Sequence, residues 1–374
     1  MTSYKFPFFD LTRQFKTIKP DVMKAVGRAF DKQAFVMGEE VTGLESELAQ
    51  FLDVKHAITC SSGTDALVLA IKALDVRPGD EIITVPFSFF ASTSAILLAG
   101  AKPVFVDIES TGFNLDPTLL EKALTKKTKA ILPVHLFGQC AEMDEILNFG
   151  KHHGLKVIED GAQAIGAKYK GRSACSMGDM GALSFYPTKN LGGAGEGGLV
   201  TTNDDALAER AKLLRVHGMK VRYTHEVLGW NSRMDALQAA VVRVKLPHLK
   251  GWVQRRARLA SNYSEAFSSF EKKGLVSLPK VLPEREHVWN QYTIMIENRD
   301  AVRKKLEEHG IPTDIFYPKT IPAQPVLQEL GYSDDGFPVA KECARKALAL
   351  PIFPELKDSE QGEVIASLSE ILNQ

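Results

Sequence analysis

The chain alternates short apolar runs with longer segments in which apolar residues recur every three to four positions. Short runs that are rich in Val and Ile and bounded by Gly, Pro or Asp are typical of buried strands. Such runs occur at residues 56–60, 81–86, 102–107, 129–134, 155–160, 181–186 and 198–202. Most of the segments between them have helical spacing, which predicts an α/β fold with a mostly parallel sheet.

The last two runs are separated by a glycine-rich loop instead of a helix, so we expect a mixed sheet of seven strands. After about residue 205 the pattern changes to long helical stretches, and Pro247 and Gly251 interrupt one of them. We therefore place a domain boundary near residue 246. Residues 1–246 are expected to form a large domain and residues 247–374 a smaller C-terminal α/β domain.

The charge balance and the cysteines narrow the possible partners. Lys and Arg together number 46, as do Asp and Glu, so the formal net charge is zero and neither nucleic acid nor an anionic membrane is an expected partner. No apolar run approaches the ~20 residues that span a bilayer. The four cysteines are widely spaced, and the first residues lack the pattern of a signal peptide, so we expect no metal site and a cytoplasmic location.

The segment "SFYPTKNLGGAGEGG" at 184–198 admits two interpretations. Gly193, Gly195 and Gly198 match the pattern G-x-G-x-x-G of dinucleotide-binding loops. That pattern binds pyrophosphate only where it follows a strand and opens a helix. Here it runs into the predicted strand at 198–202, which disfavours NAD. The other interpretation is that Lys189 is presented on a turn for covalent chemistry.

Candidate chemistry gathers at the carboxyl ends of the predicted strands, where α/β sheets place their active sites. Residues 61–64, "SSGT", open a helix and suit a phosphate. Later strands are followed by phenyl rings, a carboxylate, an amide and a lysine, namely Phe87, Phe89, Phe90, Asp160, Gln163 and Lys189. Taken singly, the serines, the rings and Asp160 are better explained as helix caps or core side chains. Together, a phosphate cradle, a stacking ring, a carboxylate and a lysine meet the needs of pyridoxal 5′-phosphate.

Four motifs carry a resemblance to a known family, namely "SSGTDAL", "EDGAQA", "SFYPTKNLGGAGEGG" and "GWNSRMDALQAA". In this order they resemble the DegT/DnrJ/EryC1/StrS family of pyridoxal-phosphate-dependent sugar aminotransferases. The resemblance implies the type I, aspartate aminotransferase-like fold, with Lys189 as the catalytic residue that forms a Schiff base. It further implies that Gly63, Thr64 and Ser184 contact the cofactor phosphate and that Phe89 stacks on the ring. Asp160 is then expected at the ring nitrogen and Gln163 at the ring hydroxyl. Asn231 is expected to reach the phosphate of the neighbouring subunit's cofactor.

The resemblance also implies the reaction. An amino group passes from an amino acid, expected to be L-glutamate, through pyridoxamine 5′-phosphate to a nucleotide-linked keto-sugar in amino-sugar biosynthesis. The segments "PVHLFGQ" and "LRVHGMKVRYTH" look most like members that aminate C3 of a UDP- or dTDP-linked 3-keto-hexose. Their histidines, His135, His217 and His225, are candidate sugar or phosphate contacts, although packing and surface roles are commoner. A homodimer with shared active sites is expected.

Other interpretations remain open, namely a 4-keto-sugar aminotransferase, a sugar dehydratase on the same fold and a non-catalytic regulatory protein. Dehydratases of this kind replace the lysine with histidine, so Lys189 disfavours the second. The neutral charge and the pair of Lys189 and Asp160 disfavour the third. One segment, "FYPKTIPAQ", departs from the family, with Thr320 and Pro322 where many relatives have proline and histidine. In some members that histidine helps line the sugar site, so its replacement by Pro322 changes which groups are expected to bind the sugar.

Overall fold

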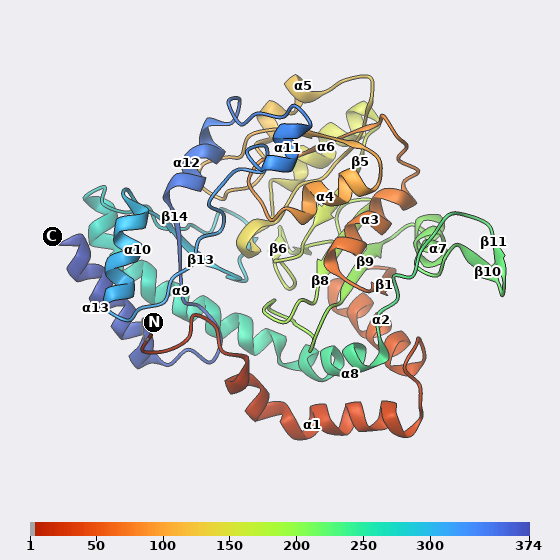
Figure 1. Cartoon of the computed structure of the whole chain (residues 1–374), viewed down its shortest axis with the longest axis horizontal. Helices are drawn as coiled ribbons and strands as arrows, with labels where there is room; N and C mark the ends of the chain where they lie inside the picture. Colours follow the sequence, from red (N-terminus) through yellow and green to blue (C-terminus); the bar gives the residue numbers. More distant parts are fainter. Residues whose placement is uncertain (1–3) are drawn as a thin grey trace.

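A computed structural model describes residues 4–374 and has a seven-stranded sheet at its centre (Figure 1). The strands lie in the order β1-β9-β8-β5-β4-β2-β3. They are β1 (His56–Cys60), β2 (Glu81–Thr84), β3 (Lys102–Phe105), β4 (Thr128–Ile131), β5 (Lys156–Asp160), β8 (Met180–Ser184) and β9 (Gly198–Thr202). Only β9 is antiparallel to its neighbours, β1 and β8. The predicted mixed seven-stranded sheet is confirmed.

Helices cover both faces of the sheet, so its strands are buried almost throughout. The covering helices include α2 (Glu39–Leu52), α3 (Gly63–Ala73), α4 (Ala91–Leu98), α6 (Met143–His153) and α7 (Asp205–Leu214). Parallel strands need such helical crossovers, whereas β8 and β9 are joined by the glycine-rich loop alone. That loop therefore returns the chain in the opposite direction, as the sequence predicts.

A second core lies towards the C-terminus. It is built from α9 (Leu249–Lys272), α10 (Arg299–Glu308) and α13 (Asp358–Leu372) against the pair of β13 (Tyr292–Met295) and β14 (Ala347–Leu350). Phe6 from the N-terminal segment is part of this core, and Cys343 of α12 (Pro338–Lys346) is part of the large-sheet core. The chain thus crosses between the two cores more than once, and a boundary at residue 246 stays a prediction.

The remaining elements are short or peripheral. They are α1 (Leu11–Asp31), η1 (Pro117–Leu119), α5 (Leu120–Ala123), η2 (Leu136–Gly138), β6 (Lys168–Tyr169), β7 (Arg172–Ser173), β10 (Met219–Val221), β11 (Thr224–His225), α8 (Ala236–Lys245), η3 (Leu246–His248), β12 (Arg285–Glu286) and α11 (Pro325–Glu329). None of the helices within residues 4–374 is both long enough and apolar enough to cross a membrane.

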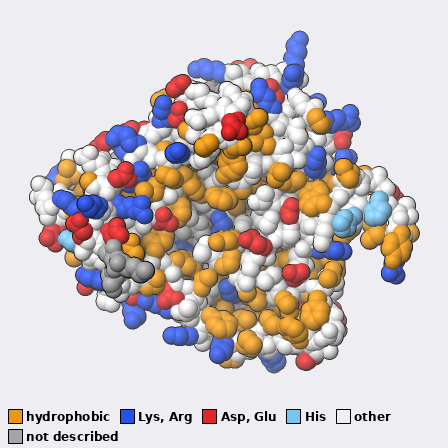
Figure 2. Space-filling model, in the orientation of Figure 1, with side chains coloured by type: hydrophobic (Ala, Val, Ile, Leu, Met, Phe, Trp, Pro, Cys, Tyr) orange, Lys and Arg blue, Asp and Glu red, His pale blue; other side chains and the backbone are white. Residues whose placement is uncertain are grey.

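Two of these elements stand out on the surface. Helix α1 lies along one side and packs against α8 through Ile18, Val22 and Val241 (Figure 1). The hairpin of β10 and β11 projects at the right of the view, beyond α7 (Figure 1). Apolar side chains gather over α1 in Figure 2, and its exposed residues include Met23 and Phe30.

Candidate active site

The candidate residues meet at one edge of the sheet because β1, β5 and β8 run in the same direction. Gly198, the first residue of β9, pairs with Cys60 at the end of β1 and with Ser184 at the end of β8. A Cβ on Gly63 would lie only 2.6 Å from the Cβ of Ser184. Glycine at position 63 therefore allows the start of α3 to touch the end of β8.

The N-terminus of α3 is free to bind an anion. Ser62 caps the helix by accepting a hydrogen bond from the Asp65 N–H at 3.1 Å. Within residues 4–374, the N–H groups of Gly63 and Thr64 have no acceptor. Because the first N–H groups of a helix carry partial positive charge, this end can bind a phosphate. The hydroxyl of Ser184 lies beside it, 3.0 Å from where a Cβ on Gly63 would be.

Asp160 is buried at the end of β5, and each of its carboxylate oxygens has a donor. The Ala162 N–H donates to Oδ1 at 3.1 Å, and the hydroxyl of Ser92 donates to Oδ2 at 2.7 Å. Ser92 is itself 3.1 Å from the hydroxyl of Ser88. Sequence reasoning missed Ser92, although a polar residue four positions after Ser88 in an apolar segment was a usable signal. These contacts fix the orientation of the carboxylate.

Lys189 follows β8 on a turn closed by its own N–H, which donates to the carbonyl of Tyr186 at 2.9 Å. Its side chain is largely buried. Burial lowers the pKa of Lys189 to about 8, and the negative charge of Asp160 opposes that shift. Among the described residues, no hydrogen bond or ion pair occupies Nζ. A lysine in this state has a neutral amine far more often than an exposed one.

Close packing and hydrogen bonds hold the turn that carries Lys189. A Cβ on Gly192 would lie 2.3 Å from the carbonyl oxygen of Pro187, so glycine here permits close packing. The buried Lys245 donates from Nζ to the Gly192 carbonyl at 2.8 Å. Asn190 donates to the carbonyl of Val288 at 2.9 Å. The backbone under Lys189 is therefore anchored on both sides.

Gln163 and Phe89 approach the same place from other elements. Gln163 accepts a hydrogen bond from the Phe137 N–H at 2.6 Å and donates to the Tyr317 hydroxyl at 3.2 Å. The Phe89 ring is largely exposed, and its centroid lies 6.2 Å from that of Tyr317. Tyr317 was not singled out by the sequence, and it links these two predicted cofactor contacts.

The histidines turn out to be packing or surface residues. His135 is fully buried, where its Nδ1 accepts from the Ala141 N–H at 3.1 Å and its Nε2 lies 2.9 Å from Glu159. It therefore contributes to the core and has no exposed polar group for a sugar. His217 and His225 lie at the projecting hairpin, where the His225 ring donates to the His217 carbonyl at 2.8 Å.

Thr320 and Pro322, the two departures from the family, and Asn231 do not join the central group of contacts. Thr320 is buried, and its hydroxyl lies 3.3 Å from Asp334. Pro322 is also buried. Asn231 is exposed and accepts from Arg233 at 3.0 Å. Both neighbours of Asn231 contact the α3 end: Ser232 through Ser61, and Trp230 by donating from its indole to Asp65 at 3.0 Å.

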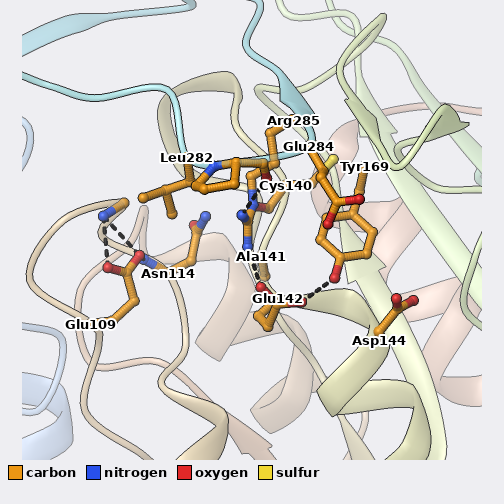
Figure 3. Close-up of polar contacts among 12 residues, drawn as sticks. Glu109, Asn114, Cys140, Ala141, Glu142, Asp144, Tyr169, Leu282, Glu284 and Arg285 are labelled. Carbon is orange, nitrogen blue, oxygen red and sulfur yellow. Dashed lines mark hydrogen bonds and ion pairs between the residues drawn. The ribbon is translucent and has the colours of Figure 1, made fainter.

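A second polar cluster ties the segment around β12 to the loop before α6 (Figure 3). Arg285 donates to Glu142 at 2.7 Å and to the Cys140 carbonyl at 2.9 Å. Tyr169 also donates to Glu142. Arg285, Glu142 and Cys140 border a cavity of about 330 Å³. Because the cluster satisfies its own charges, we interpret it as an anchor for the chain that continues into residues 287–290.

Comparison with known proteins agrees with this geometry. A model of the DegT/DnrJ/EryC1/StrS aminotransferase family matches residues 16–369. The chain is 47% identical to a pleiotropic regulatory protein of Geobacillus stearothermophilus, over 97% of this chain and 98% of that one. It is 40% identical to a UDP-N-acetyl-3-dehydro-alpha-D-glucosamine 3-aminotransferase of Acidithiobacillus ferrooxidans, over 98% of both. The structure of S. venezuelae DesV in complex with a ketimine intermediate matches with a TM-score of 0.95 and 38% identity, over 100% of both chains.

Proposed function

Because this chain belongs to the DegT/DnrJ/EryC1/StrS aminotransferase family, we propose that it transfers an amino group from an amino acid to a nucleotide-linked keto-sugar. The cofactor is pyridoxal 5′-phosphate, which alternates with pyridoxamine 5′-phosphate. One observation carries the proposal. The amine of Lys189 and the carboxylate of Asp160 interact at the sheet edge where the N-terminus of α3 is open.

The residues present fit this cofactor. We assign the cofactor's phosphate to Gly63, Thr64 and Ser184. Asp160 is assigned to its ring nitrogen and Gln163 to its ring hydroxyl. Phe89 stacks on its ring face, and Lys189 binds its aldehyde. When bound, the cofactor withdraws electrons from the substrate carbon that loses or gains the amino group. Lys189 moves the proton at that carbon, and a pKa of about 8 suits it to both accept and donate near neutral pH.

The proposed acceptor is a UDP- or dTDP-linked 3-keto-hexose, and the proposed donor is L-glutamate. The 3-aminotransferase relative supports amination at C3. Thr320 and Pro322 are buried, so neither offers the polar group that a histidine supplies in some family members. The sugar contacts on this side must therefore come from other residues.

The function is tested with the purified protein and its visible absorbance. Glutamate should bleach the yellow form, and one nucleotide-linked keto-sugar from a panel should restore it. Borohydride reduction should fix the cofactor to the peptide that contains Lys189, and Lys189→Ala should bind the cofactor without turnover. A protein that never binds the cofactor would point to the regulatory role for which the Geobacillus relative is named. Labelling of a different lysine would refute the assignment of Lys189.

We also propose a homodimer with shared active sites. The support is the apolar surface over α1, the projecting hairpin with its exposed Tyr223, and the exposed positions of Phe89 and Asn231. In such a dimer Asn231 reaches the partner's cofactor phosphate, and each subunit completes the site of the other.

Mixing inactive subunits tests the shared site. Lys189→Ala and Asn231→Ala chains, each inactive alone, should regain activity after exchange, because one site of every mixed dimer keeps both residues. Random mixing restores about a quarter of the sites. Inactivity after verified exchange would instead place Asn231 in its own chain's site.

The proposed location is the cytoplasm. All four cysteines, Cys60, Cys140, Cys175 and Cys343, are buried free thiols. Thiols persist in the reduced state in the cytoplasm, which supports this location.

A further inference from the structure

The orientation of the Gln163 side-chain amide follows from its neighbours. The Phe137 N–H can only donate, so the atom that it meets at 2.6 Å is the amide oxygen of Gln163. The NH₂ group therefore points the other way. One of its hydrogens meets the Tyr317 hydroxyl at 3.2 Å, and the second has no acceptor within residues 4–374, so a ligand can accept from it.

The turn that carries Phe137 is itself fixed. Asn290 donates from its N–H to the Phe137 carbonyl at 2.9 Å, and Val288 donates to the carbonyl of Gly138 at 2.9 Å. The cluster of Arg285 and Glu142 in Figure 3 anchors the same stretch a few residues earlier. The amide oxygen of Gln163 thus meets a backbone group that is held in place from two sides.

Tyr317 is held just as firmly on the opposite side of the amide. Its ring packs edge-on against the buried Phe87, with centroids 6.1 Å apart, and contacts Phe89 at 6.2 Å. The following segment docks on the end of β2, where the Ile321 N–H donates to the Pro86 carbonyl at 2.7 Å. Burial raises the pKa of Tyr317 well above its usual value, so the phenol stays neutral and can accept from an amide.

We propose that Tyr317 is a positioning residue that acts through Gln163, holding the free amide hydrogen towards the ring hydroxyl of the cofactor. The proposal rests on the assignment of Gln163 to that hydroxyl under the proposed function. It also gives a role to the segment "FYPKTIPAQ", which departs from the family at the sugar side. Tyr317 fixes one cofactor contact through a hydrogen bond and supports the Phe89 ring through packing.

The pH titration of the bound cofactor's visible absorbance reports this contact. A hydrogen bond donated to the ring oxygen stabilises it most when it carries a full negative charge, which is after the lysine–cofactor linkage has lost its proton. Loss of the donor therefore raises the midpoint of the titration. Gln163→Ala should raise it by about 1 pH unit, the shift that one hydrogen bond of ordinary strength produces.

Three variants and a control separate the possible outcomes. Tyr317→Phe keeps the ring contacts, loses the hydroxyl and should raise the midpoint by about half as much as Gln163→Ala. In the double variant the midpoint should equal that of Gln163→Ala alone, since Tyr317 acts through Gln163. The control is Tyr332→Phe, which removes a hydroxyl bonded to the Pro103 carbonyl at 2.9 Å and should leave the midpoint unchanged.

Each contrary result has a distinct meaning. If Gln163→Ala leaves the midpoint unchanged while the cofactor stays bound, the assignment of Gln163 to the ring hydroxyl is wrong. If Gln163→Ala raises it but Tyr317→Phe does not, the role of Tyr317 is refuted and the proposed function stands. An additive shift in the double variant would also overturn the proposal, because Tyr317 would then act on the cofactor independently of Gln163.

Discussion

The titration of Lys189 in the cofactor-free protein gives a quantitative test of the site. An ordinary lysine has a pKa of 10.5, and burial lowers that of Lys189 to about 8. At pH 7 about one tenth of such amines are neutral, compared with about 1 in 3,000 for an ordinary lysine. Only the neutral amine attacks an aldehyde. The reaction with pyridoxal 5′-phosphate at pH 7 should therefore be about 300-fold faster than for an exposed lysine of equal nucleophilicity.

The assay is the rate of cofactor uptake by the cofactor-free protein, followed by visible absorbance between pH 6 and 10. The rate should rise with pH and level off above a midpoint near 8. The charge of Asp160 favours the protonated amine, so it holds the pKa of Lys189 higher than burial alone would. Asp160→Asn removes this charge and should move the midpoint to lower pH.

The direction in which the midpoint moves separates the effect of the Asp160 charge on the Lys189 pKa from the effect of burial. Asp107→Asn serves as a control, because Asp107 is a buried carboxylate bonded to the Ala340 N–H and does not act on Lys189. It should leave the midpoint unchanged. A midpoint near 10 in the native protein would mean that Lys189 is hydrated. A rise with Asp160→Asn would contradict the interaction between the two side chains.

Gly63→Ala should weaken cofactor binding at least tenfold in an equilibrium titration, because the added Cβ would lie 2.6 Å from Ser184 Cβ. Ser92→Ala should lower kcat by about tenfold or more with an unchanged fold by circular dichroism, since it removes a hydrogen bond to the charged Asp160; an unchanged kcat would show that the bond is dispensable. Lys189→Met should stabilise the cofactor-free protein by up to about 3 kcal/mol at pH 7 in urea unfolding. The penalty of burying the charge is full below pH 8 and vanishes as pH rises towards 10.5, so the gain should shrink over that range.

Most of the fold was predictable because its strands carry their own signal. The seven central strands are buried on both faces, so each is a short apolar run that can be recognised without its neighbours. The absence of a helix between β8 and β9 predicted the mixed sheet. The short pairs, such as β6 with β12, were not predictable, because two residues pair with a segment more than a hundred positions away.

The candidate site also contains residues that local sequence reveals and residues that depend on distant contacts. Lys189, Asp160 and Gly63 stand in motifs at strand ends, and local sequence is enough to select them as candidates. Tyr317 has no local signal, because its contact with Gln163 spans 154 positions. His135 lies in a segment that resembles sugar-binding members, but its ring bonds Glu159 in the core. From the sequence alone, a histidine beside a strand end fits both a sugar contact and a core role, and only its neighbours in the structure decide between them.

The glycines after Lys189 show how much a motif leaves undecided. Glycine is common in mobile turns, but it also occurs where two backbone segments pack too closely for a side chain. In the structure, Gly192 lies too close to the Pro187 carbonyl for any side chain, and Lys245 donates to its carbonyl. A lysine has four rotatable methylene bonds, so its amine can move without any backbone motion. A fixed turn then holds the backbone of Lys189 in one position while its amine moves, which favours catalysis by preorganisation.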